Sequence, residues 1–126
     1  MKILVADDDR VLSQLLCAVA RKAGHVPVAA FDAMQTLMFA MQAPAPGLII
    51  LDINMPGGTG LEALRKLKLS ARTSPIPVIV VSGSDDAAMP EQVRALGADE
   101  YLPKPIDPDV LLDVIQRVQR EAESAR

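Results

Sequence analysis

The chain has 126 residues, of which 50% are hydrophobic and 23% are charged, and its formal net charge is −3. This length suits a single domain spanning 1–126, and the composition is that of a soluble globular protein rather than a disordered chain. One tyrosine, two phenylalanines, no tryptophan and no basic stripe exclude the surfaces that proteins use to stack and neutralise nucleic acids. We therefore expect one globular domain that does not bind nucleic acid directly.

The compartment is predicted from cysteine usage and from the absence of long apolar runs. The only cysteine, Cys17, excludes an internal disulfide and fits a reducing environment. No apolar run approaches the length that crosses a membrane, and the apolar part of the opening MKILVADDD is too short for a signal peptide. We expect a cytoplasmic protein that makes no contact with membranes.

Five short apolar runs are predicted to be strands, and stretches with helical periodicity separate them. The runs are Lys2–Ala6, Val26–Ala30, Leu48–Leu51, Val78–Val81 and Tyr101–Leu102. Nearly continuous apolar strands that alternate with helices are typical of a parallel sheet covered on both faces. The pattern predicts an α/β fold of five strand–helix units.

The first predicted helix follows Asp9, which we expect to be its cap, and ends at Gly24. Its apolar residues at helical spacing are Leu12, Leu15, Leu16, Val19 and Ala23. This stripe puts Cys17 on the opposite face beside Ser13 and Arg21, where we assign it no role.

The second predicted helix carries Met34, Leu37, Met38 and Met41 at helical spacing and ends at the segment APAPG. Methionines in such a stripe can form an adaptable binding surface, but they more often fill a core. We predict that this stripe faces the core, which leaves Phe39 off the buried face.

The remaining helices have clearer boundaries. The third buries Leu61, Leu64 and Leu67 and turns basic residues towards solvent, and a short fourth helix over Pro90–Leu96 is closed by Gly97. In the fifth, an aspartate caps the helix and a proline takes its first position. These two residues and the predicted buried stripe are Asp107, Pro108, Leu111, Val114, Ile115, Val118 and Ala122.

Reactive side chains follow four of the five predicted strands. They are Asp7-Asp8-Asp9, Asp52, Ser82 and Lys104. An aspartate after a strand is usually a turn or cap residue, but the carboxyl ends of parallel strands share one edge, where ligands bind. Four such positions at one edge predict a site.

The charges of this predicted site indicate its chemistry. Clustered carboxylates repel one another, so we expect a raised pKa for at least one of them and a bound cation. Oxygen ligands without a cysteine or histidine set suit Mg²⁺, for which Mn²⁺ could substitute, rather than zinc. A carboxylate beside such a metal, a hydroxyl and a lysine is what phosphoryl transfer to an aspartate needs.

Four stretches, ILVADDD, LIILDINMPGGTGLEAL, PVIVVSGSDD and GADEYLPKPI, together resemble the receiver domain of bacterial two-component response regulators. The resemblance covers essentially the whole chain. It implies a flavodoxin-like doubly wound sandwich whose parallel strands have the order 2-1-3-4-5. It also implies that Asp52 is the phospho-acceptor and that Asp7, Asp8 and Asp52 bind Mg²⁺ with the backbone carbonyl of Asn54.

The resemblance assigns roles to four further residues. Ser82 corresponds to a hydroxyl that moves towards the phosphoryl group, and Tyr101 to an aromatic switch residue that changes rotamer with it. Lys104 corresponds to the lysine partner of the acceptor, and the bond from Lys104 to Pro105 is expected to be cis.

The implied function is signalling rather than enzymatic turnover. The domain would accept its phosphoryl group from a sensor histidine kinase or a histidine phosphotransfer protein. Its own catalysis would be limited to its phosphorylation and dephosphorylation. The surface of the fourth helix, fifth strand and fifth helix would then signal to a downstream protein, from a monomer or a phosphorylation-promoted dimer.

The sequence departs from the family pattern at Gly47 and Thr59, and Gly57-Gly58 would leave the loop after Asp52 unusually free to bend.

Three alternatives remain. A haloacid-dehalogenase-like phosphatase would use Asp7 as nucleophile, with Asp9 and Val11 completing its signature, but would leave Asp52 without a role. An FMN-binding flavodoxin would need a hydroxyl- and glycine-rich phosphate loop, where this chain has three aspartates. A pseudo-receiver would act by contact alone, yet none of the reactive groups is missing.

Overall fold

Strands and helices alternate along the chain in the computed structural model, which describes residues 1–55 and 60–124. The strands are β1 (Lys2–Ala6), β2 (Val26–Ala30), β3 (Leu48–Asp52), β4 (Val78–Ser82) and β5 (Glu100–Pro103). The helices are α1 (Arg10–Lys22), α2 (Ala33–Met41), α3 (Gly60–Leu69), α4 (Met89–Ala95) and α5 (Pro108–Ser124). The expectations for Gly57, Gly58 and Thr59 lie outside the described residues.

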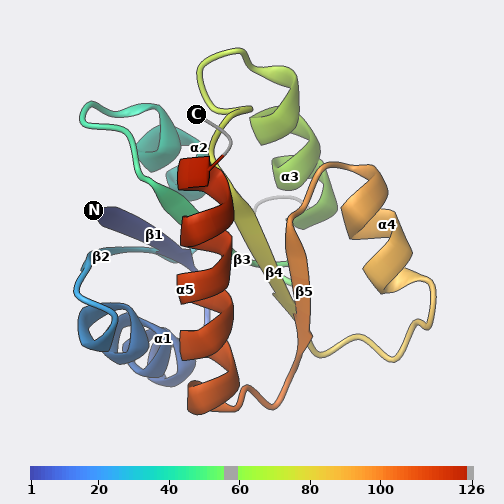
Figure 1. Ribbon diagram of the computed structural model, residues 1–126. Helices are drawn as coiled ribbons and strands as arrows, with labels where there is room; N and C mark the ends of the chain where they lie inside the picture. The colour runs from blue at the N-terminus through green and yellow to red at the C-terminus, as the bar shows by residue number, and fades with distance from the viewer. Residues whose placement is uncertain (56–59, 125–126) are drawn as a thin grey trace.

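The five strands form one parallel sheet in the order β2-β1-β3-β4-β5, as predicted (Figure 1). In its register, Ala6 at the end of β1 lies beside Leu51 of β3, and Ser82 at the end of β4 lies beside Pro103 of β5. Every residue of the central strands β3 and β4 is buried. The register brings the segments that follow β1, β3, β4 and β5 to a common edge.

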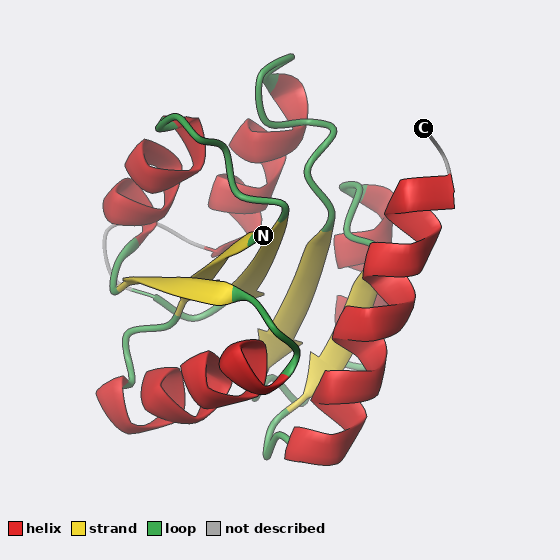
Figure 2. Ribbon diagram, turned by 60° about the vertical axis from the view of Figure 1, so that its left-hand side comes forward, coloured by secondary structure: helices red, strands yellow, loops and turns green. Residues whose placement is uncertain are grey.

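Helices cover both faces of the sheet (Figures 1 and 2). Alternate side chains of the strands point to opposite faces, and they form two separate core clusters. One cluster packs under α2, α3 and α4 and includes Leu4, Leu51 and Val80, whereas the other packs under α1 and α5. The doubly wound architecture is therefore confirmed. Of the described helices, none is both long and apolar enough to cross a membrane.

The predicted inner face of α1 is correct except at Leu15, because Leu16 and Val19 are buried and Leu12 and Ala23 pack against the same core cluster. The prediction that Cys17 and Ser13 lie on the opposite face is wrong, because Cys17 is 8% exposed and Ser13 is buried, whereas Leu15 is 37% exposed. The residues that face the sheet and α5 are Ser13, Leu16, Cys17, Val19 and Ala20. The buried face thus combines large aliphatic residues with small side chains, and the small ones extend it beyond the stripe that the aliphatic residues mark.

The predicted inner face of α2 is wrong. Met34, Met38 and Met41 are 68%, 54% and 44% exposed. The helix instead buries Ala33, Thr36 and Ala40, while Leu37 and Phe39 pack at the border of the core. The Thr36 hydroxyl donates a hydrogen bond of 2.8 Å to the carbonyl of Asp32, which satisfies its polar group inside the protein.

The other helices agree with the predicted patterns. In α3, Leu64 and Leu67 are buried and Leu61 lies at the border of the core, and Gly97 after α4 has the positive φ of 105° that favours glycine. In α5 the buried residues are Leu111, Val114, Ile115 and Val118. The Asp107 carboxylate accepts a hydrogen bond of 2.9 Å from the N–H of Asp109, which fits its predicted capping role.

Candidate functional site

Three aspartates meet at the carboxyl edge of the sheet. Asp7 follows β1 directly and Asp52 ends β3, and the two strands are hydrogen-bonded neighbours. Asp7 and Asp52 are buried, whereas Asp8 is exposed. A carboxylate oxygen of each lies within 4.8 Å of the others. The three aspartates therefore lie together at the edge where the strand pattern predicts them.

Local hydrogen bonds hold the two buried carboxylates. Oδ1 of Asp7 accepts the N–H of Asp9 at 2.9 Å, and Oδ1 of Asp52 accepts the N–H of Asn54 at 3.1 Å. Asp9 in turn caps α1 by accepting the N–H groups of Val11 and Leu12. Because each carboxylate is tied to the backbone two residues later, the start of each loop fixes its orientation.

Lys104, which directly follows β5, reaches the acidic cluster with its side chain. Its Nζ lies 3.3 Å from Oδ1 of Asp52 and 3.4 Å from Oδ2 of Asp7. Its backbone N–H donates to the carbonyl of Ser82 at 2.8 Å, which continues the pairing of β4 and β5. The Lys104–Pro105 peptide bond is cis, as the resemblance implied.

Ser82 and Tyr101 occupy different environments. Ser82 is fully buried at the end of β4, and its Oγ accepts the N–H of Ser84 at 3.0 Å, which leaves its hydroxyl hydrogen for another acceptor. Tyr101 is half-buried on β5 and packs against the core cluster under α2, α3 and α4. Asn54, whose carbonyl was predicted as a ligand, is exposed just beyond β3.

Burial is the main cause of the electrostatic character of this site. It raises the pKa of Asp52 to about 6, helped by the charge of Asp7 and opposed by the Asn54 N–H and by Lys104. It also raises the pKa of Asp7. Burial would lower the pKa of Lys104, but the charges of Asp52 and Asp7 raise it overall. We expected like-charge repulsion to be the cause, and it contributes, but loss of solvent contributes more.

The donor set fits a hard divalent cation. Oδ2 of Asp7 is buried and accepts no hydrogen bond from any described residue, although Lys104 lies nearby. A buried carboxylate oxygen of this kind calls for a cation. The clustered ligands are carboxylates, which suit Mg²⁺, and no histidine or cysteine belongs to the described cluster.

Two residues at this edge escaped the sequence analysis. The guanidinium carbon of Arg10 lies 4.2 Å from the centre of the Phe31 ring, a cation–π contact between the segments after β1 and β2. The segment after the second strand is the one for which the sequence predicts no reactive side chain. Only the position of this segment in the sheet could have indicated the contact, because β2 lies beside β1 and ends at the same edge.

Fold and site together define a flavodoxin-like domain with a cluster of three aspartates and a lysine at the carboxyl edge of its sheet. The family model of the response regulator receiver domain matches residues 3–116, and the chain belongs to this family. It is thus a receiver domain of the two-component signalling systems, with a role in phosphorelay signalling. The matches do not favour the phosphatase, the FMN-binding protein or the pseudo-receiver.

Individual relatives agree with this assignment. The chain is 36% identical over 121 residues to the phosphate regulon transcriptional regulatory protein PhoB of Klebsiella pneumoniae, covering 94% of this chain but 52% of that protein. The chain thus spans about half the length of the PhoB relatives it matches. It is 36% identical over 117 residues to Protein PilH of Pseudomonas aeruginosa, covering 93% of this chain and 96% of PilH.

A solved structure has the same fold over nearly the whole chain. It is a response regulator receiver domain protein, described as CheY-like, from Methanospirillum hungatei. The TM-score is 0.90 at 26% identity, and the match covers 99% of this chain and 98% of that chain.

Proposed function

We propose that Asp52 is the phospho-acceptor of this receiver domain and that a histidine kinase or histidine phosphotransfer protein is its physiological donor. The supporting observation is the buried carboxylate of Asp52, 1% exposed, 3.3 Å from the ammonium of Lys104 and clustered with Asp7 and Asp8. A nucleophile, a cation and further carboxylates at one sheet edge are the groups that phosphoryl transfer to an aspartate requires.

The hydrogen bonding of Asp52 indicates which oxygen reacts. Oδ1 accepts the Asn54 N–H and lies near Lys104, so Oδ2 is the oxygen left to attack phosphorus. As the new O–P bond forms, the bond from phosphorus to the donor breaks and the donor keeps that electron pair. Lys104 then neutralises part of the phosphoryl charge, and the Ser82 hydroxyl donates a hydrogen bond to a phosphoryl oxygen.

The acidic cluster serves as the metal site in this proposal. Asp7, Asp8 and Asp52 would hold Mg²⁺, or Mn²⁺ in its place, together with the backbone carbonyl of Asn54. When bound, the metal ion supplies positive charge that neutralises the phosphoryl oxygens. The buried Oδ2 of Asp7 supports this assignment, because it has room for a ligand: it accepts no hydrogen bond from a described residue, and Nζ of Lys104 lies 3.4 Å from it.

The proposed output surface comprises α4, β5 and α5. Ser82 would move towards the phosphoryl group, and Tyr101 would change rotamer with it. Glu100 of β5 supports this surface, because its carboxylate pairs with Arg94 of α4 at 3.4 Å and with Arg117 of α5 at 2.6 Å. A downstream protein would read the surface, from a cytoplasmic monomer or a phosphorylation-promoted dimer in which 1–126 is one receiver domain.

Phosphoryl incorporation tests the proposal. The protein is incubated with a small phosphodonor such as acetyl phosphate, with Mg²⁺ or with a chelator, and its mass is measured. We expect one acid-stable, base-labile phosphoryl group that requires Mg²⁺. Asp52→Asn should abolish it, whereas Asp113→Asn, at an exposed position of α5, should not. Equal incorporation by Asp52→Asn and the unaltered protein would refute the proposal.

A further inference from the structure

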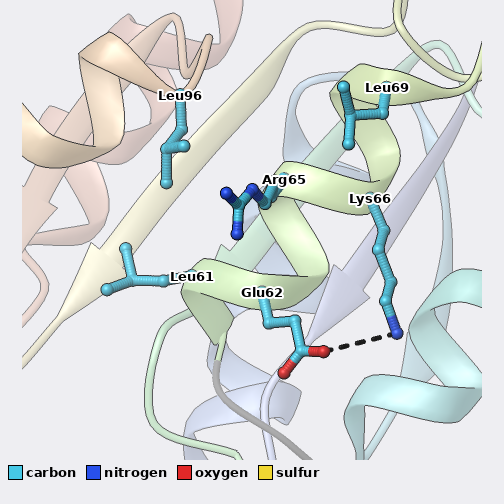
Figure 3. Close-up of a pocket in the computed structure, with 6 residues that line it drawn as sticks. All are labelled: Leu61, Glu62, Arg65, Lys66, Leu69 and Leu96. Atoms are coloured by element: carbon cyan, nitrogen blue, oxygen red, sulfur yellow. Dashed lines mark ion pairs between the residues drawn. The ribbon is translucent and has the colours of Figure 1, made fainter.

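A groove between α3 and α4 takes no part in the acidic site, and α4 is the one element that it shares with the proposed output surface (Figure 3). Its volume is about 630 Å³, and its lining residues are Leu61, Glu62, Arg65, Lys66, Leu69 and Leu96. An adjoining hollow adds Gln92 and Ala95 of α4 to this lining. The groove therefore runs along the flank of α4 that faces α3, whereas the proposed output surface uses the flank that faces β5.

The groove is lined by both leucines and charged residues, and the leucines form its apolar part. Leu61 and Leu96 are half-buried and pack against the core below, so their positions are fixed. Leu69, at the end of α3, is 78% exposed. A single exposed leucine needs no explanation, but three leucines bordering one hollow form a surface on which another apolar side chain could be buried.

The polar residues of the groove leave one positive charge without a counter-charge. Lys66 pairs with Glu62 at 3.5 Å along α3, and Figure 3 shows this pair lying away from α4. The guanidinium of Arg65 points instead into the space between α3 and Leu96. Within the described part of the chain, no residue forms an ion pair or a hydrogen bond with the side chain of Arg65. The groove thus offers a cation between leucines, on a chain whose net charge is −3.

We propose that the α3–α4 groove binds an acidic amphipathic helix of a partner protein. Its aliphatic side chains would pack between Leu61, Leu69 and Leu96, and one of its carboxylates would pair with Arg65. A helix fits a groove walled by two helices and presents apolar residues and carboxylates at the i, i+4 and i+7 spacing that such a groove reads. The complementarity of an acidic helix with Arg65 favours it over a basic one.

Two synthetic helical peptides test this proposal. Both carry leucines at i, i+4 and i+7, and they differ only in flanking residues, which are glutamate in one and lysine in the other. Each is titrated into isotopically labelled protein while the backbone amide resonances are followed. We expect the glutamate peptide to shift the amides of Leu61–Leu69 and Gln92–Leu96 and to bind about fivefold more tightly than the lysine peptide.

Charge reversal supplies the decisive variant. Arg65→Glu should reverse the preference between the two peptides, whereas Arg72→Glu, the same charge change at an exposed position outside the groove, should preserve it. Leu69→Ala should weaken both peptides without altering their ratio. If Arg65→Glu failed to fold, judged from its amide spectrum, Arg65→Gln should abolish the preference.

Several results would overturn the proposal. One is equal affinity for the two peptides, or no shift at millimolar peptide. Another is a set of shifted amides on the exposed methionines of α2 or on α5. Reversal of the preference by Arg72→Glu as well would show that net charge, not the groove, selects the peptide. Self-association that Leu69→Ala removes would identify a second copy as the occupant.

Discussion

Asp7 and Asp52 lose nearly all contact with solvent at the ends of β1 and β3. Burial raises the pKa of Asp52 from 3.8 to about 6, because loss of solvent penalises its charge more than Asn54 and Lys104 stabilise it. A carboxylate with a raised folded-state pKa binds more protons when folded than when unfolded. Its charge therefore weakens the fold fully above about pH 6, and this penalty disappears as the pH falls towards 3.8.

Asp52→Asn should consequently stabilise the metal-free protein near neutral pH, by about 1–3 kcal/mol. Urea unfolding of both proteins, near pH 7 and again near pH 4, measures the difference. The difference in unfolding free energy should shrink at the lower pH. The contributions of the other carboxylates are the same in both proteins and cancel. If Asp52→Asn were less stable than the unaltered protein at neutral pH, Asp52 would be a structural cap and not a buried charge that weakens the fold.

Mg²⁺ should stabilise the native state through the same carboxylates. At a free concentration ten times the dissociation constant, the free energy of unfolding should rise by about 1.4 kcal/mol. Calorimetric melting with and without Mg²⁺ measures this effect. Asp7→Asn should remove most of it, while Asp113→Asn on the exposed face of α5 serves as the control. An undiminished Mg²⁺ effect in Asp7→Asn would put the metal elsewhere.

The positions of the site residues were predictable where they depend only on the end of a strand. Parallel strands put whatever follows them at one edge, which is why Asp7, Asp52 and Lys104 could be grouped from sequence. The individual contacts were not predictable, because the bond from Asn54 to Oδ1 of Asp52 depends on the path of the loop. The contact of Arg10 with Phe31 joins residues from two separate loops, which no spacing rule connects.

At the scale of elements, α1 and α2 show where helical periodicity misleads. Ranking side chains by size marked Leu15 and Met34 as buried, yet both are exposed. The faces that pack on the sheet carry Ala20 in α1 and Ala33 and Ala40 in α2, because small residues permit close approach. Strand positions were predicted better, since the central strands are buried on both faces and read as continuous apolar runs.

The buried face of α1 predicts the reactivity of Cys17. A thiol that is 8% exposed should react with a thiol reagent only when the helix opens, so its labelling should be far slower than that of the unfolded protein. Following the reaction with a chromogenic disulfide reagent, with and without denaturant, measures this protection. Equally fast labelling in native buffer would return Cys17 to the outer face of α1.

Glu100 connects three elements of the proposed output surface. Burial alone would raise the pKa of Glu100, but hydrogen bonds from Arg117 and the Tyr101 N–H, with the charges of Arg117 and Arg94, lower it overall. Its contribution to stability is therefore present above the unfolded pKa of 4.5 and is lost as the pH falls through the lower folded value.

Glu100→Gln should destabilise the fold by about 1 kcal/mol near neutral pH, because the surface pairs are solvent-screened but form a network. Hydrogen exchange should quicken in α4 and in the part of α5 around Arg117, because these segments hold the two arginines that pair with Glu100. The matched control is Glu91→Gln, an exposed glutamate of α4. Unchanged exchange in α4 and α5 would show that this network does not hold the surface together.

At the scale of the whole molecule, alternation of strands and helices was enough to predict the layers. The strand order came from the family resemblance, since alternation alone does not fix the order of a parallel sheet. The sheet order places β1 beside β3, and this adjacency gathers the acidic cluster. The groove between α3 and α4 was not foreseen, because it depends on how two helices lie relative to each other.

We propose that this receiver domain is phosphorylated on Asp52, and chemical mapping of the acyl phosphate identifies the modified residue. After incubation with acetyl phosphate and Mg²⁺, borohydride reduction converts a phosphorylated aspartate to homoserine, which tandem mass spectrometry locates in a peptide. We expect homoserine at position 52, and at no position in the Asp52→Asn protein. Homoserine at position 7 instead would show that Asp7, and not Asp52, is the nucleophile.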